Sequence, residues 1–179
     1  MKLLITLTDI AAFTAFSTNI GAHLVTPYIR EAQTFDVKLP VLVRAELEAE
    51  LPTINPLFKP EEFEAVNFPQ EAVAAGWANP KLARAWYEAI RPLLALEAAR
   101  RMLLWHGLHI TPAGCENGSA LPITDGQRAA LRADLQAKAM HYRALYEAAL
   151  HTLAPITSPA GCAPTRRRPS NGGLRSAAL

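Results

Sequence analysis

Cysteine, long apolar runs and targeting signals are all scarce in this sequence of 179 residues. Its two cysteines, Cys115 and Cys162, are too few for a disulfide scaffold and favour reduced thiols in a cytosolic setting. No stretch approaches the ~18 uninterrupted apolar residues that cross a bilayer, so we expect no transmembrane helix. Lys2 and the apolar residues after it resemble a signal peptide, but Asp9 interrupts the apolar stretch and no small-residue cleavage site follows. We therefore expect no secretion signal.

The β-branched aliphatic residues are also few. The chain has 33 Ala and 24 Leu against 15 Val plus Ile, and Ala and Leu lose little entropy in a helix. The length is ample for one ordinary domain but too short for two good-sized ones. Composition therefore predicts an all-α fold, a small helical bundle with appendages.

Hydrophobic spacing predicts three helices in the first third of the chain. The apolar, β-compatible opening at residues 3–7 leads to Thr8 or Asp9, either of which can cap a short helix that carries Ile10, Phe13 and Phe16. Helices at about 22–38 and 41–51 follow, separated by Pro40. Their predicted buried stripes are Leu24, Tyr28, Ala32 and Phe35, and then Leu42, Ala45 and Ala49.

Two longer helices are predicted in the second half. Asn79 and Pro80 mark the start of one that runs to His106–Gly107, with a kink or break at Pro92. Its second segment, Leu93–Trp105, is apolar on almost every side and should be the most buried helix. After a turn-rich connection at 108–123 with a short extended pair, Thr124–Asp125 cap a helix at about 126–153. Its predicted apolar stripe is Leu131, Leu135, Tyr142, Leu145 or Tyr146, Ala149 and Leu153, opposite a polar side with Arg128, Arg132, Gln136, Lys138 and Arg143.

The stretch between these halves, residues 52–79, has a different character. Four prolines alternate with aromatic residues, and a single helical turn is predicted at Glu61–Val66. Excursions of this length are uncommon unless they have a role. Two interpretations stay open, a packed surface flap held down by its aromatics or a partner-contact insertion made by Phe58, Phe63, Phe68 and Trp77.

No pattern of catalytic or metal-binding residues stands out. His106, His109 and Cys115 have the residue types of a zinc site, but no fourth ligand follows at a convincing spacing. The sequence has no Gly-rich phosphate loop, His-Glu-x-x-His or Gly-x-Ser-x-Gly pattern. We therefore predict no enzyme activity, no catalytic residue, no metal and no cofactor.

The net charge of +2 hides an uneven distribution. After Pro155 there are four arginines and no acid, whereas the preceding part has 14 Lys and Arg against 16 Asp and Glu. Residues 1–154 are thus predicted to form a mildly acidic helical domain, and residues 155–179 a basic arm too rich in Pro and Gly to form a core. The arginines Arg166, Arg167, Arg168 and Arg175 could bind nucleic-acid phosphates or a partner's acidic groove, or serve only as a solubilising tail.

The order of several short motifs resembles the head-tail connectors, or adaptors, of tailed bacteriophages. The motifs are Leu4–Thr6 with Asp9–Ile10, then Tyr28–Gln33 with Asp36, then Ile90–Ala95, and finally His106–Gly107 with Thr111, Pro112 and Gly114. The resemblance covers about residues 3–51 and 86–153 and fails over the excursion and the arm.

This resemblance implies a structural virion protein of the neck, assembled in the host cytoplasm. It implies a homo-oligomeric ring of about a dozen copies that binds the portal protein, receives a stopper or tail-completion protein, and extends the channel for double-stranded DNA without sequence-specific binding. The arm with Arg166, Arg167, Arg168 and Arg175 is then the candidate portal-binding segment. The alternatives are a small basic-tailed nucleic-acid-binding protein and a tail-completion or stopper protein of the same neck.

Overall fold

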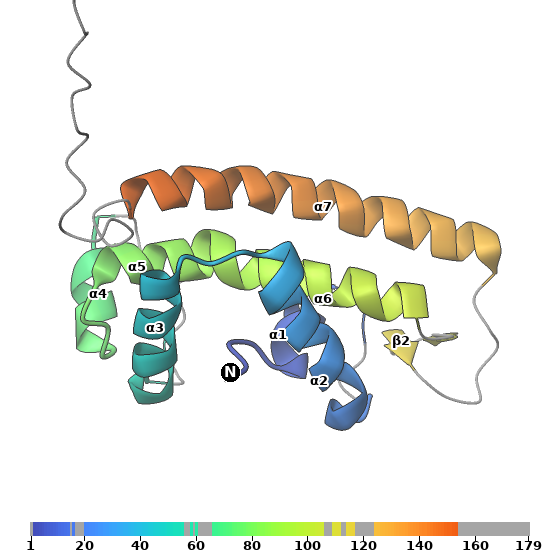
Figure 1. The fold of residues 1–179 in the computed structure, drawn as a ribbon, viewed down its shortest axis with the longest axis horizontal. Helices are drawn as coiled ribbons and strands as arrows, with labels where there is room; N and C mark the ends of the chain where they lie inside the picture. The colour runs from blue at the N-terminus through green and yellow to red at the C-terminus, as the bar shows by residue number, and fades with distance from the viewer. Residues whose placement is uncertain are drawn as a thin grey trace, which may run out of the picture.

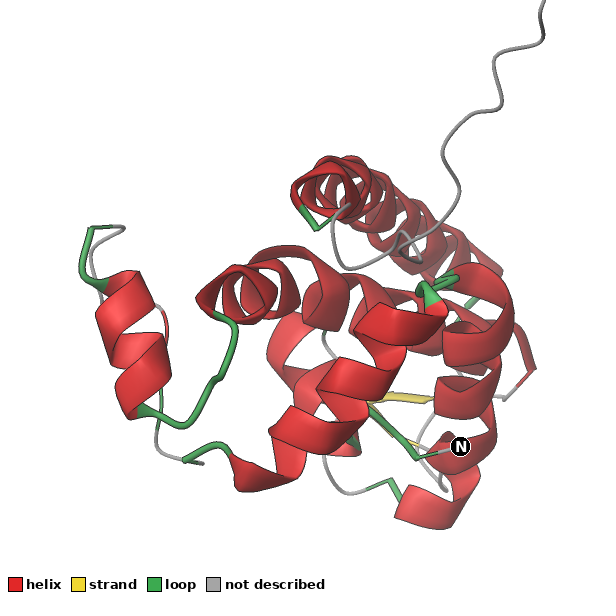
Figure 2. Cartoon of the chain, turned by 60° about the vertical axis from the view of Figure 1, so that its left-hand side comes forward, coloured by secondary structure: helices red, strands yellow, loops and turns green. Residues whose placement is uncertain are grey.

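A computed structural model describes residues 2–14, 16, 20–55, 58, 60, 66–105, 109–111, 114–116 and 124–153; for residues 104–105 and the two strands it describes the backbone alone. Figure 2 shows that this part is built almost wholly from helices, which confirms the predicted all-α fold class. The predicted arm, residues 155–179, lies outside the described residues.

The helices form layers, with one continuous helical segment in the middle. This segment consists of α5 (Pro80–Ala85), the π-helical η4 (Trp86–Ile90) and α6 (Arg91–Trp105). The long helix α7 (Asp125–Thr152) runs along one side of it (Figure 1). On the other side lie α1 (Leu7–Phe13), α2 (Ala22–Glu31) and the π-helical η1 (Ala32–Asp36). Helix α6 is therefore the centre of the molecule, as predicted.

Shorter elements complete the described part. Helix α3 (Val41–Glu50) continues into a 3₁₀ turn, η2 (Leu51–Thr53), and α4 (Phe68–Ala74) packs against α5. The strands β1 (His109–Thr111) and β2 (Gly114–Glu116) pair antiparallel with Ile110 opposite Cys115. This confirms the short extended pair predicted between residues 108 and 123.

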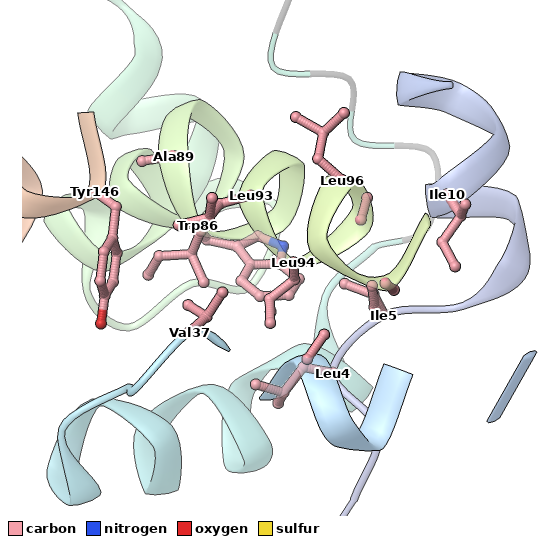
Figure 3. Close-up of a cluster of buried hydrophobic side chains, with 14 of the residues drawn as sticks. Leu4, Ile5, Ile10, Val37, Trp86, Ala89, Leu93, Leu94, Leu96 and Tyr146 are labelled. Carbon is pink, nitrogen blue, oxygen red and sulfur yellow. The ribbon is translucent and has the colours of Figure 1, made fainter. Parts of the chain in front are cut away.

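The core surrounds α6 on three sides. Leu93, Leu94 and Leu96 are each at most 1% exposed, and Leu94 points toward Leu4 and Ile5 of the N-terminal segment, whereas Leu96 points away from them (Figure 3). Residues 2–6 form no regular strand, although the apolar opening is β-compatible. Leu4 and Ile5 pack into the core instead, while Leu3 is 38% exposed.

Three helices begin with side-chain caps. Thr6 and Asp9 form a reciprocal capping box at α1, and Thr124 and Gln127 form another at α7. The Asn79 side chain accepts hydrogen bonds from the backbone of Lys81 and Leu82 at α5, as the sequence predicted. The cap predicted at Thr8 or Asp9 was wrong by two or three residues, because Asp9 is the third helical residue and Thr6 precedes the helix.

Several predicted buried faces were wrong. Ala32 is buried as predicted, but Phe35 is 62% exposed, because the π turns of η1 shift the helix phase and bury Gln33 instead. In α3 the buried residues are Val43 and Leu47, whereas the predicted stripe of Leu42, Ala45 and Ala49 is exposed throughout. In α7 the predicted stripe holds at Leu135 and Leu153, Tyr146 is the one of the two alternatives that faces the core, and Ala139 is an unpredicted addition.

The interruption predicted at Pro92 takes the form of η4. Proline has no N–H for the carbonyl four residues before it, and its ring crowds that carbonyl. The wider π turns just before Pro92 relieve this conflict, and the Arg91 N–H bonds the Trp86 carbonyl, five residues back. The helix therefore continues through the proline, and neither splits nor ends there.

The excursion at 52–79 is fastened to the body where it is described. Asn55 donates a backbone hydrogen bond to Ala75 across the excursion, at 2.9 Å. Gly76 has φ of +106°, a conformation that L side chains rarely adopt, and it ends α4. Helix α4 was not predicted, and the helical turn predicted at 61–66 falls largely outside the described residues.

Candidate interaction site on helix α7

Helix α7 is held to the body by a narrow stripe. It has 28 residues, about 42 Å at 1.5 Å per residue, yet only Leu135, Ala139 and Tyr146 among them are buried. The Tyr146 hydroxyl donates to the Lys38 carbonyl at 2.9 Å, and burial raises the pKa of this phenol. Most of the surface of α7 is thus left to solvent.

A buried carboxylate joins α7 to α6. The Glu97 side chain is 3% exposed and accepts hydrogen bonds from Arg100 on its own helix, at 2.6 Å, and from Arg143 on α7. Arg143 also donates to the Asp36 carbonyl at 3.5 Å. Placing Arg143 on the solvent side of α7 was therefore wrong, because its long side chain reaches back to the neighbouring helix.

Arg101 extends this network to the α2–η1 junction. Its guanidinium contacts Asp36 at 2.5 and 3.0 Å and Glu31 at 2.6 Å, and it lies over the ring of Phe35 at 5.8 Å. The hydrogen bond to Asp36 raises the pKa of Arg101 above its already high value. Three arginines and three carboxylates therefore balance one another across α2, η1, α6 and α7.

This network is suited to holding helices rather than to reacting. Each of its carboxylates is paired with a guanidinium, which stays charged at any physiological pH. Within the part of the chain that the structure describes, no group of three His, Cys, Asp or Glu side chains could hold a metal. The side chains of His106, His109 and Cys115 lie outside that part.

A second acidic pair, Glu46 and Glu50, lies where α3 meets the start of α5. The Asn79 amide donates to Glu46 at 3.3 Å, and the backbone N–H groups of Ala78 and Asn79 bond Glu50. Partial burial, and then the charge of Glu46, raise the pKa of Glu50 above its usual value. Ionisation of Glu50 is therefore less favourable in free energy in the folded protein than in the unfolded chain.

The outward face of α7 carries no Asp, Glu, Lys or Arg over most of its length. At 100° per residue, one sector about 80° wide opposite the buried stripe contains only small or apolar side chains from Gly126 to Ala148, and His151 follows in the last turn. The six residues of this sector between Gly126 and His151 are all exposed, and Met140 is 66% exposed. They are Ala130, Ala133, Ala137, Met140, Ala144 and Ala148. We call this set the outer stripe. Exposed helix faces are normally charged or polar, so a stripe of this length is a candidate contact surface.

Two cavities lie along one flank of α7, between the outer stripe and the body. The first, about 480 Å³, lies between α7 and the α5–η4 segment. The second, about 490 Å³, lies between α7 and α1–α6 and is lined by Phe13, Leu96 and His141 among others. Eight residues of α7 line the cavities, and all eight fall on one side of the helix, so the two cavities follow one another along the same flank: Ala137, Lys138, His141, Tyr142, Leu145, Ala148, Ala149 and Thr152. Ala137 and Ala148 lie at the border between this flank and the outer stripe.

The residues predicted as partner contacts have different positions. Phe68 and Trp77 are 6% and 1% exposed, and the half-buried Phe58 lies 6.1 Å from Phe68 and 5.5 Å from Tyr87, centroid to centroid. Trp77 lies 5.9 Å from Tyr87. These three aromatics hold the excursion to the body, as the packed-flap interpretation expects, and Phe68 and Trp77 have almost no surface to offer a partner.

The other predicted site residues are not described. Phe63 and the arginines of the arm, Arg166, Arg167, Arg168 and Arg175, lie outside the described residues. Sequence reasoning missed the network and the outer stripe. Two signals were available in the sequence. The charged residues Glu97, Arg100 and Arg101 in the otherwise apolar segment Leu93–Trp105 pointed to the network, and a second stripe of α7 without charged residues pointed to the outer stripe.

Comparison with protein-family models, with curated proteins and with solved structures found no match to this chain. No helix in the described ranges is long and apolar enough to cross a membrane.

Proposed function

We propose that this protein is a structural subunit of a tailed-bacteriophage neck, a head-tail connector that assembles as a ring between the portal and the stopper or tail-completion protein. The role is non-enzymatic and belongs to the virion, with assembly in the host cytoplasm. The observation that carries the proposal is the outer stripe of α7, a long exposed helix face without Asp, Glu, Lys or Arg. The ordered resemblance to connectors supports it.

The outer stripe is suited to a neighbouring copy. It extends from Ala130 to Ala148, about 27 Å along the axis, and its alanines allow another helix to approach closely. A ring contact joins two different surfaces of identical subunits, so each copy needs one exposed face of this kind and a second surface that receives it. Met140 is the largest exposed side chain of the stripe and would be its main anchor.

The charged network supports the same role by stiffening the subunit before assembly. Glu97 and Arg143 hold α7 on α6, and Arg101 holds α6 on the α2–η1 junction. A surface that is already ordered loses less conformational entropy on binding than one that must fold first. The outer stripe is thus presented on a preorganised body.

The test compares two charge insertions on α7. Met140→Glu places a carboxylate in the outer stripe, whereas Gln136→Glu places one at an exposed position beside it. Mass photometry is recorded for the purified chain alone and for the chain mixed with the portal protein encoded near its gene. Ring-sized species should appear for the wild type and for Gln136→Glu. Met140→Glu should shift the distribution to monomers.

Two outcomes would contradict the proposal. A wild-type chain that stays monomeric with the portal protein at micromolar concentration would rule out the connector role. Duplex DNA binding by that monomer, weakening steeply as salt rises, would favour the alternative of a basic-tailed nucleic-acid-binding protein.

A further inference from the structure

Two cavities follow one another along the flank of α7, and together we call them the flank groove. On the body side it is bordered by α5 and η4 and then by α1 and α6. In the first cavity Ala85 and Ala89 lie opposite Ala148 and Ala149, and Lys81, Arg84 and Glu88 line the cavity as well. The small alanine side chains leave room for a narrow, extended segment between the two helices.

The described part of the chain ends at one end of this groove. Thr152 lines the first cavity, and the next residue, Leu153, is 1% exposed and anchored in the core. Residues 154 and onward therefore start beside the groove, at the end where α5 begins (Figure 1). From Thr152 to Lys138, the groove follows α7 for about 21 Å at 1.5 Å per residue.

The residues that follow Leu153 have a composition and a length that suit binding in the flank groove. The run from Ala154 to Pro164 has no charged residue, three prolines and one large aliphatic side chain, Ile156. Prolines at 155, 159 and 164 favour an extended left-handed conformation of about 3.1 Å per residue. About seven such residues cover 21 Å, so this run is long enough to reverse direction and fill the groove.

We infer that residues 155–162 fold back along α7 and bind in the flank groove of their own chain, so that Arg166, Arg167 and Arg168 leave the body near the N-terminal half of α7. The own chain is the expected occupant because a tether of a few residues gives an effective concentration in the millimolar range. The inference does not rest on the connector proposal, since it concerns the isolated chain.

A disulfide scan tests this placement with the cysteine that the arm already contains. Eleven residues of α7 separate Thr152 from His141, about 16 Å, which an extended arm covers by about residue 161. His141→Cys, in a chain with Cys115→Ser, should therefore lie within disulfide distance of Cys162. The matched control is Met140→Cys, one residue away and also exposed, but on the outer stripe.

Under mild oxidation with copper phenanthroline, the His141→Cys chain should form an intramolecular disulfide at least tenfold faster than the Met140→Cys chain. Non-reducing electrophoresis and peptide mass spectrometry identify the bond. Adding Ala148→Arg, which fills the first cavity with a long charged side chain, should reduce the rate to that of the control. Circular dichroism checks that each variant is folded.

Either of two results would overturn the inference. Equal rates for His141→Cys and Met140→Cys would mean that the arm samples the surface without a preferred site. Preferential formation of disulfide-linked dimers by His141→Cys would mean that the groove takes the arm of another copy.

Discussion

Removing the charge of Glu97 should loosen α7 from the body by a predictable amount. In Glu97→Gln, the amide NH₂ group would face a guanidinium, and one of the two hydrogen bonds to Arg100 and Arg143 becomes a donor–donor contact. Two charge-assisted hydrogen bonds are worth about 3–6 kcal/mol together at most. Arg100 and Arg143 are 35% and 44% exposed, so both can turn into water and recover part of that loss. We expect a net destabilisation of about 2–3 kcal/mol.

Thermal unfolding followed by circular dichroism at 222 nm measures this effect. For a domain of this size, 2–3 kcal/mol corresponds to a fall in Tm of about 5–10 °C. The control is Asp134→Asn, which breaks the Asp134–Lys138 pair, about half exposed on α7, and should change stability by under ~0.5 kcal/mol. The double variant Glu97→Gln with Arg143→Gln should lose less than the sum of the single variants. Equal Tm values for Glu97→Gln and Asp134→Asn would refute the view that Glu97 holds α7 to α6.

Three further substitutions test other parts of the fold. Trp77→Ala should destabilise the protein by about 3–5 kcal/mol in urea unfolding, because it empties a site that is 1% exposed, while Val66→Ala, at 81% exposure, should have little effect. Asn79→Ala should cost about 1 kcal/mol through loss of the cap of α5, and Asn79→Ser should recover much of it. Glu50→Gln should be more stable than the wild type at pH 7, and the difference should vanish below the usual pKa of 4.5. The folded state holds the Glu50 proton more tightly than the unfolded state, so stability falls as pH rises through the raised pKa; a stability difference independent of pH would contradict this.

The starts of α5 and α7 were predictable because their signals are local, whereas the start of α1 was predicted two or three residues too late and α4 was missed. Asn79 with Pro80, and Thr124 with Gln127, satisfy free N–H groups within three residues of chain, and no distant contact is needed. The centrality of α6 followed from its lack of a polar side. These features depend on composition and spacing alone, and the structure confirms them.

Buried faces were less predictable because they depend on helix phase. A single π turn in η1 rotates everything after it, which leaves Phe35 outside and Gln33 inside. In α3 both faces carry apolar residues, and only the packing of Val43 and Leu47 decides between them. The partners of Arg101 are 65 and 70 residues away in sequence, so no local pattern could have identified that ion pair.

The narrow attachment of α7 has a consequence for how this protein can change over evolutionary time. Substitutions at Leu135, Ala139 or Tyr146 alter the core and are limited by folding, whereas the exposed positions around them, apart from the ion-paired Arg143, carry almost no folding constraint. An unselected exposed helix position drifts readily to Lys, Glu or Arg, which are good helix formers. The six uncharged positions of the outer stripe therefore distinguish a contact surface from a folding constraint. If homologous chains keep these positions free of charged residues while the flanking positions vary, selection is acting on a contact and not on the fold.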